Sequence, residues 1–258
     1  MVRLSLLVVL VLSQPLDPTT LDDTERFLRT ARIVSNVAIG QGVTGARRLE
    51  LESGEQRRRA IFKAVDTRVD SDYHFGSETA AVFRDSFHHE IAAYELDKLL
   101  GLGLVPPVVE REIEGQRGSL QIWVTRKNLR FVREYPLPAP EAADRDVHAV
   151  RLLDYLIFNT DRHLRNLFFD EDWHPVVIDQ SRAFHALTVP ARPLHRFPRE
   201  PVARLRDLDR RQLASALGSY LDESQIDALD ARRRVVLELV EQAIAERGSA
   251  ETLFDWPR

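Results

Sequence analysis

The chain has 258 residues, a length typical of one compact domain or of two small lobes that share a cleft. Its 36 basic and 40 acidic residues give a net charge of −4, which argues against a nucleic-acid-binding protein, since such proteins usually carry a basic face. The absence of cysteine excludes disulfide frameworks, thiol catalysis and cysteine-ligated zinc. Only three basic residues are lysines (Lys63, Lys98 and Lys127), so a lysine is an exception in this chain.

The N-terminal segment has the pattern of a secretory signal. Arg3 precedes an apolar run from Leu4 to Leu12, and Ser13 offers a small residue at a cleavage point. The run is too short to span a bilayer as a helix, and no other stretch is long and apolar enough to do so. We therefore expect residues 1–19 to be a signal peptide of an exported protein. A buried N-terminal strand in a cytoplasmic protein is the alternative.

The first half of the chain predicts a sheet with two helices. Period-two alternation and β-branched runs indicate strands, and three-to-four-residue apolar spacing indicates helices. In chain order we expect a helix over 20–32, strands over 33–39, 49–51 and 60–65, a polar loop over 66–85, a helix over 86–100 that Gly101 ends, and strands over 105–110 and 119–125 with a turn over 115–118.

The second half is mainly helical. We expect a linker over 135–140, a helix over 142–158, a polar stretch over 159–166, a hairpin of strands 167–169 and 175–178, an irregular loop over 186–201, and helices over 202–247. A sheet-rich half followed by a helical half predicts an α+β fold of two lobes. The N-lobe would span residues 20–125 and the C-lobe residues 126–258.

Three polar residues around the predicted hairpin suggest a metal-dependent site. The polar stretch 159–166 precedes the hairpin and Asp179 follows it, so Asp161, Asn166 and Asp179 should converge at one cleft edge. Their oxygen atoms are hard ligands suited to Mg²⁺ or Mn²⁺. The D-x-x-x-x-N spacing of Asp161 and Asn166 is that of a kinase catalytic loop. The D-x-x-x-x-N spacing alone occurs by chance in many proteins. The same spacing followed by a short hairpin and an aspartate is a much more specific pattern.

Gly40, Gly42 and Gly45 form a G-x-G-x-x-G pattern. A dinucleotide-binding fingerprint would require a helix directly afterwards, and the residues that follow alternate like a strand. A glycine loop within a hairpin is typical of a kinase lid whose backbone N–H groups approach phosphates. A plain hairpin tip is the alternative.

Lys63 lies in the apolar run Ile61–Val65 and needs a partner, because burying an unpaired ammonium is costly. A phosphate-binding lysine that pairs with a glutamate of the next helix would explain it. Glu90 is the best partner and Glu95 is the second choice. The alternative is an edge lysine whose ammonium reaches solvent.

Other charged clusters have simpler interpretations. His88 and His89 are adjacent on a helix, so they do not share a face, and we expect a solvated helix rather than a metal site. We also expect solvated faces at the arginine runs 57–59 and 232–234.

Four segments resemble a known kinase family. Residues 90–101 (EIAAYELDKLLG), 105–109 (VPPVV), 152–163 (LLDYLIFNTDRH) and 177–184 (VIDQSRAF) resemble the family of the Golgi casein kinase and the glycosaminoglycan xylosylkinase. Asn159-Thr160-Asp161-Arg162 with Asn166 is also similar to type II phosphatidylinositol 4-kinases and to bacterial HipA-type kinases. The resemblance covers roughly residues 35–185 and implies a two-lobed protein-kinase-like fold.

The resemblance also implies roles for individual residues. It places Lys63 and Glu90 at the nucleotide and metal, Asp161 as catalytic aspartate and Asp179 as metal ligand, and Asn166 follows the lipid-kinase version of the loop. The chain departs from the family in lacking cysteine and in having Gln180-Ser181 where a glycine is common. A bacterial relative of reduced size is the natural inference.

The sequence therefore predicts a kinase that depends on Mg²⁺ or Mn²⁺ and moves the γ-phosphoryl of ATP to a hydroxyl. The acceptor would be a protein serine or threonine, a sugar or an inositol lipid, and no nucleic acid is expected as a partner. The alternative is a pseudokinase, or another nucleotide-binding interaction module, that has the same fold and lacks phosphotransfer.

Overall fold

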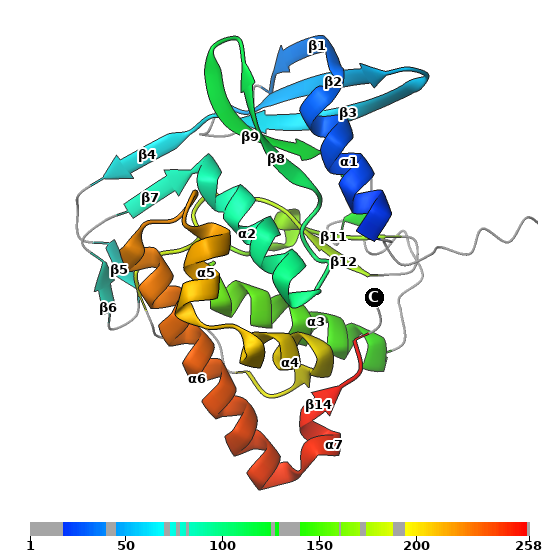
Figure 1. The fold of residues 1–258 in the computed structure, drawn as a ribbon. Helices are drawn as coiled ribbons and strands as arrows, with labels where there is room; N and C mark the ends of the chain where they lie inside the picture. The colour runs from blue at the N-terminus through cyan, green and yellow to red at the C-terminus, as the bar shows by residue number, and fades with distance from the viewer. Residues whose placement is uncertain are drawn as a thin grey trace, which may run out of the picture.

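A computed structural model gives the fold of the chain (Figure 1). It describes residues 18–39, 45–69, 73–75, 78–80, 83–124, 127–128, 140–159, 161–170, 174–187 and 194–256. Most of the predicted signal peptide, Gly40, Gly42 and most of the predicted linker lie outside these residues. Among the described residues, no helix combines the length and the apolar character needed to cross a membrane.

The N-terminal part is built on a five-stranded antiparallel sheet in the order β1-β2-β3-β9-β8. Its elements are α1 (Pro18–Thr30), β1 (Arg32–Ala38), β2 (Arg47–Ser53), β3 (Gln56–Lys63), β8 (Val108–Ile113) and β9 (Gln116–Ile122). Alternate strand residues such as Leu49, Leu51 and Phe62 are buried in one cluster with Phe27 and Leu28 of α1. The period-two pattern therefore gives the sheet one face that α1 covers.

The turn between β8 and β9 lies earlier than the sequence predicted. Glu114 and Gly115 both have positive φ, 54° and 78°, and form the turn in place of residues 115–118. The pair is a two-residue hairpin loop, for which φ > 0 at both positions is the favoured geometry. Gly118 lies within β9, where an added Cβ would meet Lys63 O at 2.4 Å.

The predicted loop over 66–85 is wrong, because this polar segment forms four short strands. They are β4 (Asp66–Val69), β5 (Tyr73–Phe75), β6 (Glu78–Ala80) and β7 (Phe83–Ser86), with β4 paired to β7 and β5 to β6. All four residues of β4 are exposed, so this strand has no alternation of buried and exposed residues to indicate it.

Helix α2 (Phe87–Leu100) lies between the sheet and the helical part (Figure 1). Ser86 caps its first turn by accepting a hydrogen bond from His88 N, and Gly101 ends it with a left-handed φ of 66°. Ten of its residues are buried, because both parts of the molecule pack on it. The predicted helix and its glycine stop are confirmed.

The C-terminal part is mainly helical and shares one large apolar core with α2. Its elements are β10 (Lys127–Asn128), α3 (Pro140–Leu156), the 3₁₀ turn η2 (Leu164–Asn166), β11 (Leu167–Phe169), β12 (Pro175–Val177), β13 (Phe197–Pro198), α4 (Arg199–Asp207), α5 (Arg210–Leu217), α6 (Glu223–Arg247), α7 (Ser249–Thr252) and β14 (Leu253–Phe254). The predicted hairpin is confirmed as β11 and β12, in which Leu167 lies opposite Val177. Helix α4 begins within the segment predicted as an irregular loop.

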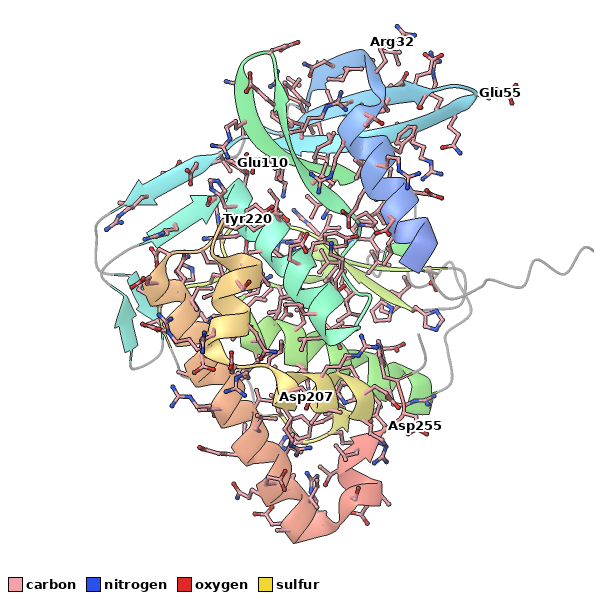
Figure 2. All side chains as sticks on the ribbon, in the orientation of Figure 1. Arg32, Glu55, Glu110, Asp207, Tyr220 and Asp255 are labelled. Atoms are coloured by element: carbon pink, nitrogen blue, oxygen red, sulfur yellow. The ribbon has the colours of Figure 1, made fainter. Side chains whose placement is uncertain are left out.

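The two parts lie at opposite ends of the molecule. Figure 2 shows Glu55, in the turn between β2 and β3, far from Asp255, which follows β14. The α+β fold with a sheet-rich first part and a helical second part is confirmed.

The two arginine runs differ in environment. Residues 57–59 are exposed, as predicted. The prediction of a solvated face is wrong at Arg232, which is fully buried and donates to the carbonyl groups of Leu156, His185 and Leu187. These carbonyls supply the acceptors that a buried guanidinium needs.

Candidate active site

Lys63 joins two carboxylates that come from distant parts of the chain. Its Nζ atom lies 2.5 Å from Glu90 Oε1 and 2.7 Å from Asp179 Oδ1. Lys63 is the last residue of β3, Glu90 lies in the first turn of α2, and Asp179 follows β12. Glu95, the second candidate partner, instead pairs with Lys98.

The three groups form a charged set at the boundary between the sheet and the helical part. Burial alone would lower the pKa of Lys63, but the charges and hydrogen bonds of Glu90 and Asp179 raise it well above its ordinary value. Burial alone would raise the pKa of Asp179, whereas the charge and hydrogen bond of Lys63 lower it. Lys63 is therefore an ammonium and Asp179 a carboxylate. Glu90 is nearly fully buried, while the Asp179 side chain is 42% exposed.

The chain around β7 and the start of α2 holds the segment that follows Asp179. Gln180 N donates to Glu90 Oε2 at 3.1 Å, Ser86 N donates to Ser181 O at 2.9 Å, and Arg182 Nε donates to Asp85 Oδ2 at 2.9 Å. Asp179 itself has a φ of 65°, in the left-handed region. The three hydrogen bonds of residues 180–182 therefore hold Asp179 in a backbone conformation that costs free energy in any residue other than glycine.

His89 belongs to the same set of contacts, and the prediction of a solvated position is wrong for it. It is 1% exposed, whereas His88 is half-buried. Its Nδ1 atom donates to Ser181 O at 2.8 Å, and its Nε2 atom accepts from Gln225 Nε2 at 2.9 Å. Burial lowers the pKa of His89 to about 4, so the ring is neutral. No metal is needed to explain this histidine.

The stretch that carries Asp161 is fixed by Arg162. The guanidinium pairs with Asp154 of α3 through Nε and Nη2, and its Nη1 atom donates to Ile178 O at 2.7 Å and to Asn166 O at 3.2 Å. Asn159 Oδ1 accepts from Asp161 N at 2.9 Å. Asp161 keeps a side chain that is 46% exposed, so its carboxylate is open to a substrate.

Asn166 lies beside the strand end that leads to Asp179. Asn166 O accepts from Ile178 N at 3.1 Å, so the hairpin brings the two predicted metal ligands together as neighbours. Asn166 is buried, and its Nδ2 atom lacks a hydrogen-bond partner among the described residues. A buried amide of this kind calls for a polar partner, and rotation of the amide would present Oδ1 to a cation.

The donor set fits Mg²⁺ or Mn²⁺. No group of three His, Asp or Glu side chains converges into a preformed metal centre in the part of the chain that the structure describes. Mg²⁺ commonly binds through one or two carboxylates together with substrate phosphates, so Asp179 and Asn166 would suffice with a nucleotide present. Glu90 already binds the Lys63 ammonium, through its Oε1 atom.

Arg182 is a site residue that the sequence reasoning missed. Its Nη1 atom lies 4.0 Å from Asp161 Oδ2. Its place in the sequence could have indicated it, because Arg182 lies three residues after Asp179 within the segment 177–184 that resembles the kinase family. The glycine pattern is described only at Gly45, which has a φ of 60° and open space where a Cβ would lie.

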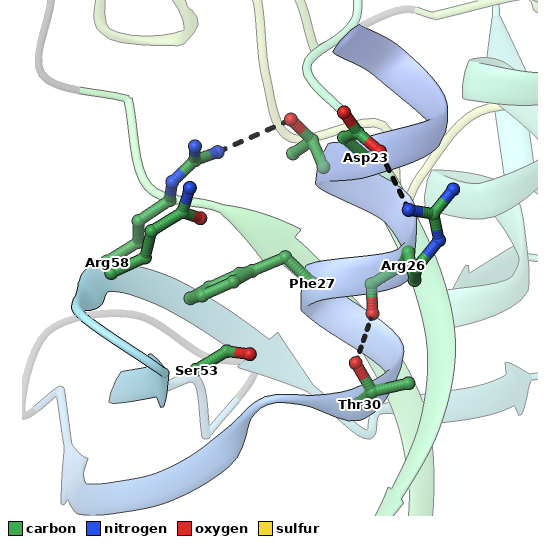
Figure 3. Close-up of a pocket in the computed structure, with 8 residues that line it drawn as sticks. Asp23, Arg26, Phe27, Thr30, Ser53 and Arg58 are labelled. Atoms are coloured by element: carbon green, nitrogen blue, oxygen red, sulfur yellow. Dashed lines mark hydrogen bonds and ion pairs between the residues drawn. The ribbon is translucent and has the colours of Figure 1, made fainter. Parts of the chain in front are cut away.

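A shallow pocket lies elsewhere, on the outer side of the sheet between α1 and the β2–β3 turn (Figure 3). Arg58 donates to Thr24, and its guanidinium lies over the Phe27 ring at 5.3 Å from the centroid. None of the predicted site residues lines this pocket. It therefore does not bear on the chemistry of Lys63 and Asp179.

Comparison with known proteins relates the chain to kinases through its structure. No family model and no curated protein matches its sequence. The structure of hydra Fam20 with sugar has a TM-score of 0.66 and 17% identity, over 93% of this chain and 93% of that chain. The Golgi casein kinase with Mn/ADP bound has a TM-score of 0.65 and 16% identity, over 92% of this chain and 79% of that one.

A kinase from a bacterium is also similar. The Helicobacter pylori proinflammatory kinase CtkA has a TM-score of 0.50 and 11% identity, over 88% of this chain and 99% of that chain. At such identities the likeness concerns the fold. The chain therefore has a kinase-like fold, with the sheet-rich part first and the helical part second.

Proposed function

We propose that the protein is a divalent-metal-dependent kinase that transfers the γ-phosphoryl group of ATP to a hydroxyl. The observation that carries the proposal is the pairing of Lys63 with both Glu90 and Asp179 at the junction of a sheet and a helical part. Kinases use a strand lysine paired with a helix glutamate to hold nucleotide phosphates. The Golgi casein kinase, which shares the fold, was solved with Mn/ADP bound, and this supports nucleotide and metal use.

Each group has a role in that reaction. Lys63 binds the phosphates as an ammonium, and Glu90 orients it through the 2.5 Å contact. Asp179 and Asn166 would hold Mg²⁺ or Mn²⁺, and Gly40, Gly42 and Gly45 would supply backbone N–H groups to the phosphates. The metal, when bound, neutralises charge on the phosphate oxygens.

Asp161 orients the acceptor. Its exposed carboxylate accepts a hydrogen bond from the acceptor hydroxyl. As the acceptor oxygen bonds to the γ-phosphorus, the bond from that phosphorus to the bridging oxygen of ADP breaks, and the hydroxyl proton passes to Asp161. ADP and a phosphorylated acceptor leave. The acceptor remains one of three classes: a protein serine or threonine, a sugar, or an inositol lipid.

Nucleotide binding and phosphotransfer test the proposal. Titration with ADP in the presence of Mn²⁺ should raise the thermal midpoint of the wild-type protein. Incubation with γ-labelled ATP and a lysate separated into protein, glycan and lipid should label one fraction. Asp179→Asn removes a metal-binding charge, so it should abolish both the metal-dependent shift and the labelling. Unchanged labelling by this variant would contradict the assignment.

A pseudokinase is the second candidate. Gln180 stands directly after Asp179 with a fully buried side chain that donates to Val177 O at 3.3 Å. Gln180-Ser181 stands where a glycine is common in the resembling kinases, and the buried Gln180 side chain favours a rigid segment after Asp179. Binding of ADP without labelling of any fraction would support this candidate over the kinase.

We also propose that residues 1–19 direct export of a bacterial protein. Expression of the full chain in a bacterial host, followed by fractionation and mass determination, tests this. A periplasmic product shortened near Ser13 supports export, and a full-length cytoplasmic product contradicts it.

A further inference from the structure

Two of the cations around Asp161 and Asp179 are each held by more than one acceptor. Lys63 binds two carboxylates, and its side chain is only 11% exposed. Arg162 binds Asp154 through two nitrogen atoms and two backbone carbonyls through the third, and its side chain is also 11% exposed. Neither side chain can move toward a group bound at Asp161 without losing these contacts.

Arg182 has a different arrangement. Its Nε atom donates to Asp85 at 2.9 Å, and its Nη1 atom points toward Asp161. The side chain is 37% exposed, so solvent and ligands reach it. The guanidinium is therefore anchored to Asp85 through Nε while its side chain is reached by solvent, as in sites where arginine recognises phosphate.

The anchor of Arg182 is rigid. Asp85 is buried, and its neighbour Ser86 donates through its backbone to Ser181 O, next to Arg182. Residues 85–86 and residues 181–182 are thus joined twice, by the ion pair of Asp85 with Arg182 and by the adjacent backbone hydrogen bond of Ser86 with Ser181. A guanidinium fixed in advance loses little conformational entropy when it meets an anion.

Arg182 and Asp161 lie close enough for one oxygen atom to contact both. The separation of 4.0 Å between Nη1 and Oδ2 is longer than a hydrogen bond. An oxygen to one side of the line that joins the two atoms can lie about 2.8 Å from each, which is hydrogen-bond distance. An acceptor hydroxyl there would donate to Asp161, and its oxygen would lie beside the guanidinium as it bonds to phosphorus.

We propose that Arg182 is a catalytic residue whose guanidinium contacts the acceptor oxygen and the phosphoryl group as the phosphoryl passes between ADP and acceptor. The proposal rests on the proposed kinase function. The moving phosphoryl carries negative charge on its equatorial oxygens, and a fixed cation stabilises it most during transfer. Arg182 undergoes no covalent change. The bonds made and broken are those given for the kinase reaction.

Three measurements on Arg182→Gln and Arg182→Lys test this role. The first is turnover of ATP with the acceptor fraction that wild-type protein labels, and the second is affinity for ADP with Mg²⁺. The third is affinity for ADP, Mg²⁺ and aluminium fluoride, whose anion resembles the phosphoryl in transit. Arg199→Gln is the matched control, because Arg199 also donates through Nε to an aspartate, Asp255, and lies in α4.

We expect Arg182→Gln to lower kcat by about 10²–10³-fold while the ADP affinity stays within about threefold of wild type. The gain in affinity that aluminium fluoride gives wild type should be lost. Arg182→Lys should recover part of the kcat and part of the affinity gain with aluminium fluoride. Arg199→Gln should match wild type in both measurements. A purely structural role predicts a lower thermal midpoint and weaker ADP binding instead.

The outcomes separate this proposal from the kinase assignment. Wild-type turnover and aluminium fluoride binding that persist in Arg182→Gln overturn the role of Arg182 and leave the kinase intact. ADP binding by wild type without turnover contradicts the kinase, and with it the catalytic role of Arg182. Failure of wild type to bind ADP with either metal overturns both.

Discussion

The Nδ1 atom of His89 donates a hydrogen bond of 2.8 Å to the carbonyl oxygen of Ser181, which lies two residues after Asp179. The same carbonyl accepts a hydrogen bond from Ser86 N. Helix α2 therefore holds the segment of the predicted metal ligand by its backbone, directly beside the contact of Glu90 with Lys63. The carbonyl group of Ser181 thus ties the backbone after Asp179 to the start of the helix that carries Glu90.

This arrangement predicts a loss of stability in acid. Burial lowers the pKa of His89 and of His185 to about 4, whereas histidine in an unfolded chain has a pKa near ~6.5. Below pH ~6.5 the unfolded state binds protons that the folded state does not, so the free energy of unfolding falls with falling pH until about pH 4. Each histidine contributes a loss of about 3 kcal/mol over this window. Above it neither contributes.

Urea unfolding at several pH values between about 7.5 and 4.5 measures the effect. His89→Gln keeps a donor and an acceptor but does not titrate, so its free energy of unfolding should depend less on pH than that of wild type. His195→Gln removes an exposed histidine and should keep the wild-type slope. Equal slopes for wild type and His89→Gln would contradict the role of the neutral ring.

The Lys63 position should reject arginine. The ammonium fits between two carboxylates at 2.5 and 2.7 Å, and a guanidinium is larger and planar. We expect Lys63→Arg to weaken binding of ADP with Mn²⁺ by about tenfold or more. Lys98→Arg is the matched control, since Lys98 pairs with Glu25 and Glu95 at a half-exposed site. Calorimetric titration of both variants checks this, and equal affinities would exclude a specific role for the ammonium.

Much of the fold could be predicted because the signals are local. Ser86 and Gly101 bound α2 with capping chemistry that three or four residues reveal. The short apolar runs 167–169 and 175–178 predicted the hairpin that brings Asp179 back to Asn166. The choice of Glu90 over Glu95 also followed from helix geometry, since the two face different sides.

What could not be predicted depends on distant partners. His89 lies among polar residues, and its burial rests on Ser181 and Gln225, 92 and 136 residues away. Arg232 begins a run of three arginines, yet its acceptors lie 45 to 76 residues earlier. The strands over 66–86 pair with one another, and β4 is exposed along its whole length. Arg182 reaches Asp161 by tertiary packing alone.

Helix α1 should stabilise α2 through Glu25. Its Oε1 atom accepts hydrogen bonds from Tyr94 at 2.9 Å and from Lys98 at 2.8 Å, and Tyr94 lies one turn after Glu90. Burial would raise the pKa of Glu25, but these two donors lower it, so the carboxylate is charged. Because Glu25→Ala removes the acceptor of the buried Tyr94 hydroxyl and leaves Lys98 with Glu95 alone, it should lower the free energy of unfolding by about 1–3 kcal/mol.

Hydrogen exchange of α2 and urea unfolding measure this effect. Asp23→Ala is the matched control, since Asp23 pairs with Arg26 on the exposed side of α1 and should change stability by less than about 1 kcal/mol. Faster exchange across residues 90–98 is expected in Glu25→Ala alone. Equal exchange in the two variants would mean that α1 does not support the helix that carries Glu90.

Arg232 should be the most costly arginine to remove. The fully buried guanidinium donates to Leu156 at the end of α3, at 2.8 Å, and to His185 and Leu187 in the segment after Asp179. It therefore joins α6 to the chain on both sides of the candidate site. Arg232→Met has a similar length but leaves three carbonyls without this donor, so the free energy of unfolding should fall by about 3 kcal/mol or more.

Arg234→Met provides the comparison, because Arg234 lies two residues later on α6 with a side chain that is 63% exposed. It should change stability by about 0.5 kcal/mol or less. Arg232→Lys keeps the charge, but a single ammonium cannot reach all three carbonyls. Its loss in free energy of unfolding should therefore lie between those of Arg232→Met and Arg234→Met. Urea unfolding of the three variants gives the order. Arg232→Met as stable as Arg234→Met would show that solvent or the backbone satisfies these carbonyls without the guanidinium.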